Sequence, residues 1–82
     1  MEISAHIKEL AEKFYYLMDA AGGQSSMNAQ SSPAEINDYL GASKEDFDKA
    51  LDFLVKKGIV KVDGKGTTII SSWAEKVCSC KK

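Results

Sequence analysis

The sequence contains no arginine, and its eleven basic residues are all lysines. Arginine makes the most frequent specific contact with guanine in the major groove, and it is favoured in narrow minor grooves. Its planar guanidinium also binds phosphate in a bidentate geometry that a lysine ammonium cannot reproduce. The absence of arginine therefore argues against sequence-specific reading of DNA.

Long apolar runs are also missing. No stretch approaches the roughly 20 apolar residues that a membrane-spanning helix needs. The N-terminus lacks the basic start and apolar block of a secretory signal peptide. We expect a soluble, cytoplasmic protein that makes no membrane contact.

Residues that commonly carry catalysis or bind metals are few. His6 is the one histidine, and no nucleophile and orienting acid accompany it in a recognisable motif. Cys78 and Cys80 form a C-x-C pair, but metal sites usually need four ligands and only His6 could join them. We expect no enzyme activity, no cofactor and no metal. Incidental thiols are favoured for the cysteines over redox or intermolecular pairing.

The length of 82 residues and the hydrophobic share of 44% are typical of one small globular domain. We assign 1–82 to this domain, with a core at about 3–77 and a tail at 78–82. The net charge of −1 hides an asymmetry. Residues 1–52 carry four lysines and ten acidic residues, whereas residues 53–82 carry seven lysines and two acidic residues. Such a split can orient a molecule on an anionic partner.

Apolar residues recur at helical spacing in three segments. The first predicts a helix over Ile3–Ala21, with Tyr16 opposite its apolar stripe and Tyr15 on the flank. A small polar segment follows and can hold a short strand around Ser26–Ala29 that joins a later hairpin. Ser32–Glu35 then reads as a capping box that begins a short helix.

A second cap at Ser43–Asp46, with aspartate in place of glutamate, predicts a third helix that ends before Gly58. Its expected buried residues are Phe47, Ala50, Leu51, Leu54 and Val55.

A β-hairpin and a terminal helix complete the predicted elements. Ile59–Val62 and Thr67–Ile70 are rich in β-branched residues, and Asp63-Gly64 is a favoured turn pair, with Lys65 and Gly66 widening the loop. The last predicted element is a helix begun by a capping box at Ser72–Glu75, with Trp73 and Val77 packing back onto the domain.

This order of elements resembles a winged-helix domain. The resemblance covers about residues 3–77 and rests on "SPAEINDYLG", "SKEDFDKALDFLVKKG" and "IVKVDGKGTTII". It implies a small α+β fold with a three-helix core, a two- or three-stranded wing and a short C-terminal helix. It also implies a transcriptional regulator that binds double-stranded DNA with the exposed side of the third helix. Homodimers formed by the first and terminal helices are a further expectation.

The exposed side of the third helix has an unfavourable charge for that role. Glu45, Asp48 and Asp52 would repel phosphate, whereas most non-specific affinity for DNA comes from basic groups. Lys49 and Lys56 lie four residues after Glu45 and Asp52, so each pair can contribute about 0.3–0.5 kcal/mol as a solvated ion pair. We therefore expect any nucleic-acid contact at the wing, the tail and the start of the third helix. The candidate residues are Ser43, Lys44, Lys49, Lys56, Lys57, Lys61, Lys65 and Thr67.

Two interpretations of the surface remain open. The lysines can bind nucleic acid, or they can keep a small domain soluble and protect the hairpin edge. Tyr15, Tyr16, Phe53 and Trp73 can form a partner interface, because aromatic residues are enriched in interfaces. The terminal helix or the long loop can instead cover them within one chain. The leading function is a DNA-binding regulator, and the alternative is a protein-interaction module or accessory subunit that binds no DNA.

Overall fold

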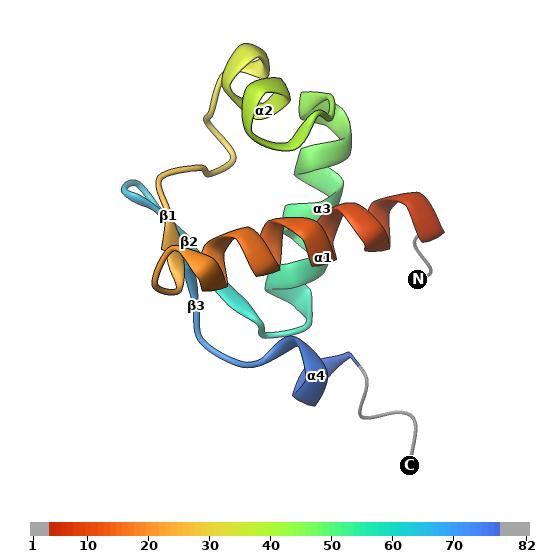
Figure 1. Ribbon diagram of the computed structural model, residues 1–82, viewed down its shortest axis with the longest axis vertical. Coiled ribbons are helices and arrows are strands. Elements are labelled where there is room, and N and C mark those ends of the chain that lie inside the picture. The colour runs from red at the N-terminus through yellow and green to blue at the C-terminus, as the bar shows by residue number, and fades with distance from the viewer. Residues whose placement is uncertain (1–3, 78–82) are drawn as a thin grey trace.

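The computed structural model describes residues 4–77, and Cys78 and Cys80 lie outside this range. The chain forms four helices and a three-stranded sheet within the described residues (Figure 1). In chain order these are α1 (Ala5–Ala20), β1 (Gln24–Ser25), α2 (Pro33–Leu40), α3 (Lys44–Lys56), β2 (Val60–Asp63), β3 (Gly66–Ile69) and α4 (Trp73–Lys76). This is the predicted α+β winged helix. None of the described helices is both long enough and apolar enough to cross a membrane.

The core lies where α1 packs across α3, and α2 closes one end of it (Figure 1). Phe14 of α1 is fully buried and meets Phe47 of α3 edge to face, with ring centroids 5.2 Å apart. Tyr39 of α2 approaches the same ring at 6.1 Å. The predicted apolar stripes therefore face one another, except that Val55 is 44% exposed. The prediction that Val55 is buried was wrong, and this residue lines a hollow between α3 and β2.

The local start signals of the helices are confirmed, but the boxes predicted at Ser43–Asp46 and Ser72–Glu75 are incomplete, because only the serine hydroxyl of each box accepts a backbone hydrogen bond. At α2 the Ser32 hydroxyl accepts a hydrogen bond from the Glu35 amide, and the Glu35 carboxylate accepts one from the Ser32 amide, which completes the predicted capping box. At α3 the Ser43 hydroxyl accepts from the Asp46 amide, but the Asp46 carboxylate lies 3.1 Å from His6 Nε2. That carboxylate therefore links the first turns of α1 and α3.

The sheet has the strand order β1-β3-β2, with both pairs antiparallel. The predicted extra strand does join the hairpin, but it lies at Gln24–Ser25 rather than at 26–29. Asp63 pairs with Gly66, so only Gly64 and Lys65 form the turn. Gly66 thus belongs to the strand and does not widen the loop, contrary to the prediction.

The terminal helix α4 packs back onto the domain as predicted. The Trp73 ring lies 5.9 Å from that of Tyr15 on α1 and 6.1 Å from that of Phe53 on α3. Trp73 is buried, and Val77 is partly buried against the core. The segment after β3, which contains α4 and which we call the strap, therefore covers the side of the α1–α3 pair that carries Tyr15 and Phe53.

Candidate nucleic-acid interface

The two faces of the sheet differ in chemistry. Side chains of directly paired residues share a face, and successive residues along a strand point to opposite faces. Thr68 is paired with Gln24 on one side and with Lys61 on the other, so these three form a polar row across all three strands. Thr67 belongs to the opposite face and is only 1% exposed. The polar row therefore faces away from the helices, and we call it the outer row.

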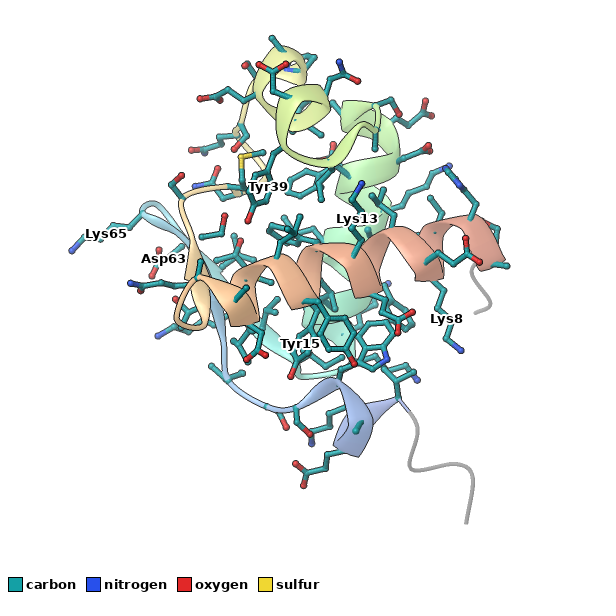
Figure 2. All side chains as sticks on the ribbon, viewed as in Figure 1. Lys8, Lys13, Tyr15, Tyr39, Asp63 and Lys65 are labelled. Carbon is teal, nitrogen blue, oxygen red and sulfur yellow. The ribbon has the colours of Figure 1, made fainter. Side chains whose placement is uncertain are left out.

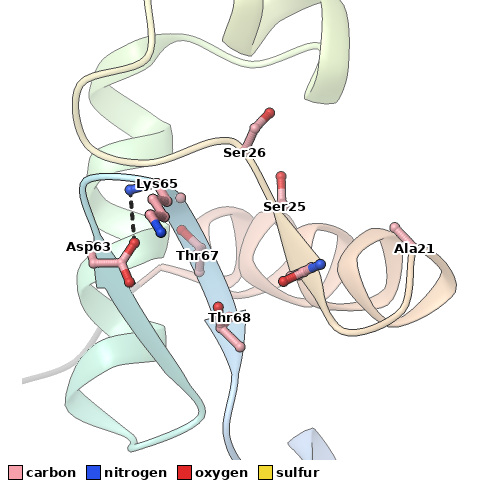
Figure 3. Close-up of a pocket in the computed structure, with 9 residues that line it drawn as sticks. Ala21, Ser25, Ser26, Asp63, Lys65, Thr67 and Thr68 are labelled. Carbon is pink, nitrogen blue, oxygen red and sulfur yellow. Dashed lines mark hydrogen bonds between the residues drawn. The ribbon is translucent and has the colours of Figure 1, made fainter.

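A polar hollow of about 480 Å³ adjoins the outer row at the hairpin. Figure 3 shows Asp63 and Lys65 at one end of it and Ala21 at the other. The Asp63 carboxylate accepts a hydrogen bond from the Lys65 amide at 2.9 Å, which occupies one of its oxygens within the turn. The hollow is lined by Ala21, Gln24, Ser25, Ser26, Asp63, Lys65, Gly66, Thr67 and Thr68.

Lys61 and Lys65 are the wing lysines of the predicted site, and both are exposed. Figure 2 shows Lys65 extending from the hairpin tip away from the helices. Neither lysine takes part in an ion pair within residues 4–77. Both ammonium groups are therefore available to an anionic ligand, at a face that also carries hydroxyl and amide groups.

Lys44 and Lys56 of α3 are less available. Lys44 donates to the Ala29 carbonyl at 2.6 Å and lies 3.5 Å from Asp48. Lys56 pairs with Asp52 at 3.2 Å, as predicted. The predicted pair of Glu45 and Lys49 is not among the ion pairs of the described residues, although Lys49 is exposed.

Two of the predicted lysines, Lys56 and Lys57, lie far from the start of α3. Ser43 caps one end of this helix and Lys56 lies at the other, about 20 Å away at 1.5 Å per residue. Lys57 follows at the same far end, with its ammonium 5.7 Å from the centroid of the Phe53 ring. Lys56 and Lys57 therefore do not join a basic surface at the start of α3, whereas Lys44 reaches the Ala29 carbonyl in the loop that also contacts the wing turn.

Thr67 was assigned to the interface incorrectly. Its side chain faces inward and its hydroxyl donates to the Met27 carbonyl at 2.7 Å, so it cannot reach an external ligand. Its neighbour Thr68 points outward in its place. Sequence analysis also missed Gln24, because a two-residue strand is too short to show alternation.

Two of the four aromatic residues expected at a partner interface are covered within the chain. Tyr15 is 7% exposed and Trp73 is 4% exposed, because they pack on each other between α1 and α4. Phe53 is partly buried at the edge of the same cluster. The terminal helix therefore covers Tyr15 within the chain, which was the predicted alternative to a partner interface. Tyr16 remains exposed at 50%.

No group of three or more histidine, cysteine or acidic residues within the described range could hold a metal ion. Apart from the Asp63 carboxylate, which is bound within the hairpin turn, the interface presents hydroxyl, amide and ammonium groups to a ligand. These groups bind phosphate oxygens and sugar hydroxyls, and they carry little information about base sequence.

The fold and the wing define a winged-helix domain. Residues 12–69, more than half of the chain, match the family described as the CvfB-like winged helix domain. The chain belongs to this family. No curated protein matches the chain significantly.

One solved structure is similar to this chain in sequence as well as in fold. It is the crystal structure of a multidomain protein with nucleic acid binding domains from Streptococcus pneumoniae TIGR4, with 38% identity and a TM-score of 0.73. The similarity covers 74% of this chain and 21% of that protein. The chain thus spans about a fifth of the length of that multidomain protein.

Proposed function

We propose that this domain binds nucleic acid through its wing and the outer face of its sheet. The observation that carries the proposal is the outer row of Gln24, Thr68 and Lys61, extended by Lys65 at the hairpin tip. Its two lysines have no ion pair in residues 4–77, so their binding to phosphate breaks no internal contact. The solved relative, described as having nucleic-acid-binding domains, supports the same function.

The proposed contact is with the phosphate backbone rather than with base edges. The outer row has no aromatic side chain on which a base could stack and no arginine to read guanine. Lysine contacts with phosphate release counterions and give affinity that falls as salt rises. Duplex DNA, and with it a role in transcriptional regulation, is the most specific form of this proposal.

The face of α3 is not part of the proposed interface. Glu45, Asp48 and Asp52 are exposed on it, and the lysines that pair with Asp48 and Asp52 are already engaged. A duplex lying along α3 would meet this negative charge. The proposal therefore differs from the usual winged-helix arrangement, in which the third helix enters the major groove.

Fluorescence anisotropy across a salt series tests the proposal. Labelled duplex DNA, single-stranded DNA and RNA of one sequence are compared, because all three present phosphate. The double change Lys61→Ala with Lys65→Ala removes two phosphate contacts. We expect it to lower the slope of log K against log salt by about 1.8 for duplex DNA, at about 0.9 per contact.

The matched control is Lys8→Ala with Lys49→Ala, which makes the same change in net charge on α1 and α3. Figure 2 shows Lys8 far from the wing, toward the opposite end of the molecule from Lys65. The control is expected to retain the slope of the unmodified protein. Equal losses in the two variants, or no binding of any probe at low salt, would contradict the proposal.

A further inference from the structure

A groove runs between α3 and β2 on the side of the sheet that faces the helices. It consists of two adjoining hollows of about 310 and 230 Å³, which share Ala29 and Val62. Val62 and Lys61 are neighbours on β2, so their side chains point to opposite faces of the sheet. The groove is therefore separate from the outer row proposed to bind nucleic acid.

The floor of this groove is apolar and accessible. Val55 of α3 is 44% exposed, and Val62 of β2 is half-buried. Leu51 and Ala29 line the same hollow. Val55 follows the helical spacing of a core residue but is only partly covered by residues 4–77, with its exposed surface beside Val62. Together these residues offer apolar surface that a ligand can bury.

The charged residues of the groove are all acidic. Asp48 and Asp52 line one hollow and Asp63 lines the other, and none of the described residues that line either hollow is a lysine. Asp48 and Asp52 each contact one lysine, Lys44 or Lys56, in pairs that stay exposed to solvent. A carboxylate has about four acceptor positions, so further donors can bind each of them.

We infer that this groove is the docking site for a polypeptide segment that combines apolar and basic residues. An apolar side chain of the segment packs against Val55 and Val62, and its lysine or arginine side chains donate to Asp48 and Asp52. Nucleic acid is disfavoured here because its phosphates would meet the Asp48 and Asp52 carboxylates. Docking of the outer row of a second copy is unfavourable, because the polar groups around its wing lysines lack the required apolar partner.

The proposed partner is a polypeptide segment of this chemistry, and it can bind while the outer row holds nucleic acid. The chemistry of the groove matches the general pattern of an apolar anchor in a pocket with complementary charges at the rim.

The test is an NMR titration of the isotope-labelled chain with a short synthetic peptide of alternating lysine and leucine. The expected result is saturable binding, with backbone shifts concentrated at Ala29, along Asp48–Val55 and at Val62. A peptide with glutamate in place of lysine is expected not to bind. Saturable binding of both peptides alike would show that charge plays no part and would overturn the inference.

Two pairs of variants separate groove binding from general attraction. Asp48→Asn with Asp52→Asn is compared with Glu9→Gln with Glu12→Gln, which removes the same charge from exposed positions of α1. Val55→Ser is compared with Ile70→Ser, since Ile70 is exposed elsewhere on the molecule. Each groove variant is expected to weaken peptide binding about tenfold or more, and each control by less than about twofold.

The substituted residues in the groove variants and in their controls are all exposed. We therefore expect every variant to keep the fold, and circular dichroism checks this. The inference is overturned if shifts map to the outer row, if groove and control variants lose affinity equally, or if duplex DNA produces the groove shifts. It is also overturned if sedimentation shows self-association that the groove variants abolish, because the occupant would then be a second copy.

Discussion

Gly66 is the position at which a single methyl group should do most damage to the wing. It has φ of +142°, a conformation that L side chains rarely adopt. A Cβ atom built there would overlap the Ser25 carbonyl oxygen and lie 2.9 Å from Ser26 Cα. Both obstacles are backbone atoms of the segment that forms and follows β1. They can yield only if that segment moves away from β3.

Gly66→Ala is therefore expected to destabilise the domain through two effects. The backbone conformation alone costs about 1–3 kcal/mol for a residue with a Cβ. Displacing β1 from β3 adds the loss of main-chain hydrogen bonds, at about 0.5–1.5 kcal/mol each. A total of about 2–4 kcal/mol corresponds to a fall in Tm of at least about 8 °C for a domain of this size.

Gly64→Ala in the adjacent turn is the matched control. Gly64 has no positive φ, and a Cβ built there meets nothing within 4 Å. We expect the control to be unchanged or stabilised by up to about 1 kcal/mol, because alanine restricts the unfolded chain. Thermal and urea unfolding followed by circular dichroism measure both variants. If Gly66→Ala is as stable as Gly64→Ala, the close approach of β1 to β3 is not as described.

Two further substitutions test the packing behind the interface. Trp73→Ala removes the ring that packs α4 against Tyr15, and it should lower the free energy of unfolding by about 3–5 kcal/mol. A loss below about 1 kcal/mol in urea unfolding would show that the strap contributes little to stability. Thr67→Val deprives the Met27 carbonyl of its buried hydrogen bond and should cost about 1–3 kcal/mol, whereas Thr68→Val on the outer face should stay within about 0.5 kcal/mol. Equal urea midpoints for the two threonine variants would contradict the assignment of the faces.

The features predicted well from sequence are those set by neighbouring residues. The hydroxyl of Ser32 and the carboxylate of Glu35 are three positions apart, and that spacing alone brings each within reach of the other's amide. The apolar stripes of α1 and α3 are set by helical periodicity in the same way. Such signals need no knowledge of the rest of the chain, and the structure confirms both.

The features predicted poorly depend on contacts between distant residues. Thr67–Ile70 has no alternation of polar and apolar residues, so its register and its outward face are set by pairing with β1 and β2. Lys44 pairs with Asp48 while its ammonium is also held by the Ala29 carbonyl, from a loop fifteen positions earlier. Val55 continues an apolar stripe but is exposed, and helical spacing alone cannot show which residues of the stripe other elements cover.

The basic and acidic halves of the chain contribute to two different surfaces, because successive side chains of β2 point to opposite faces of the sheet. Lys61 points to the outer face, and Val62 faces the groove that Asp48 and Asp52 line. One strand therefore contributes a cation to a polar surface and an apolar group to an acidic one. Moving its register by one residue would exchange these groups, placing the lysine beside the carboxylates and the valine in the polar row. The pairing of β2 with β3, which Gly66 helps to hold against β1, is thus the structural condition for keeping the two proposed binding surfaces chemically distinct.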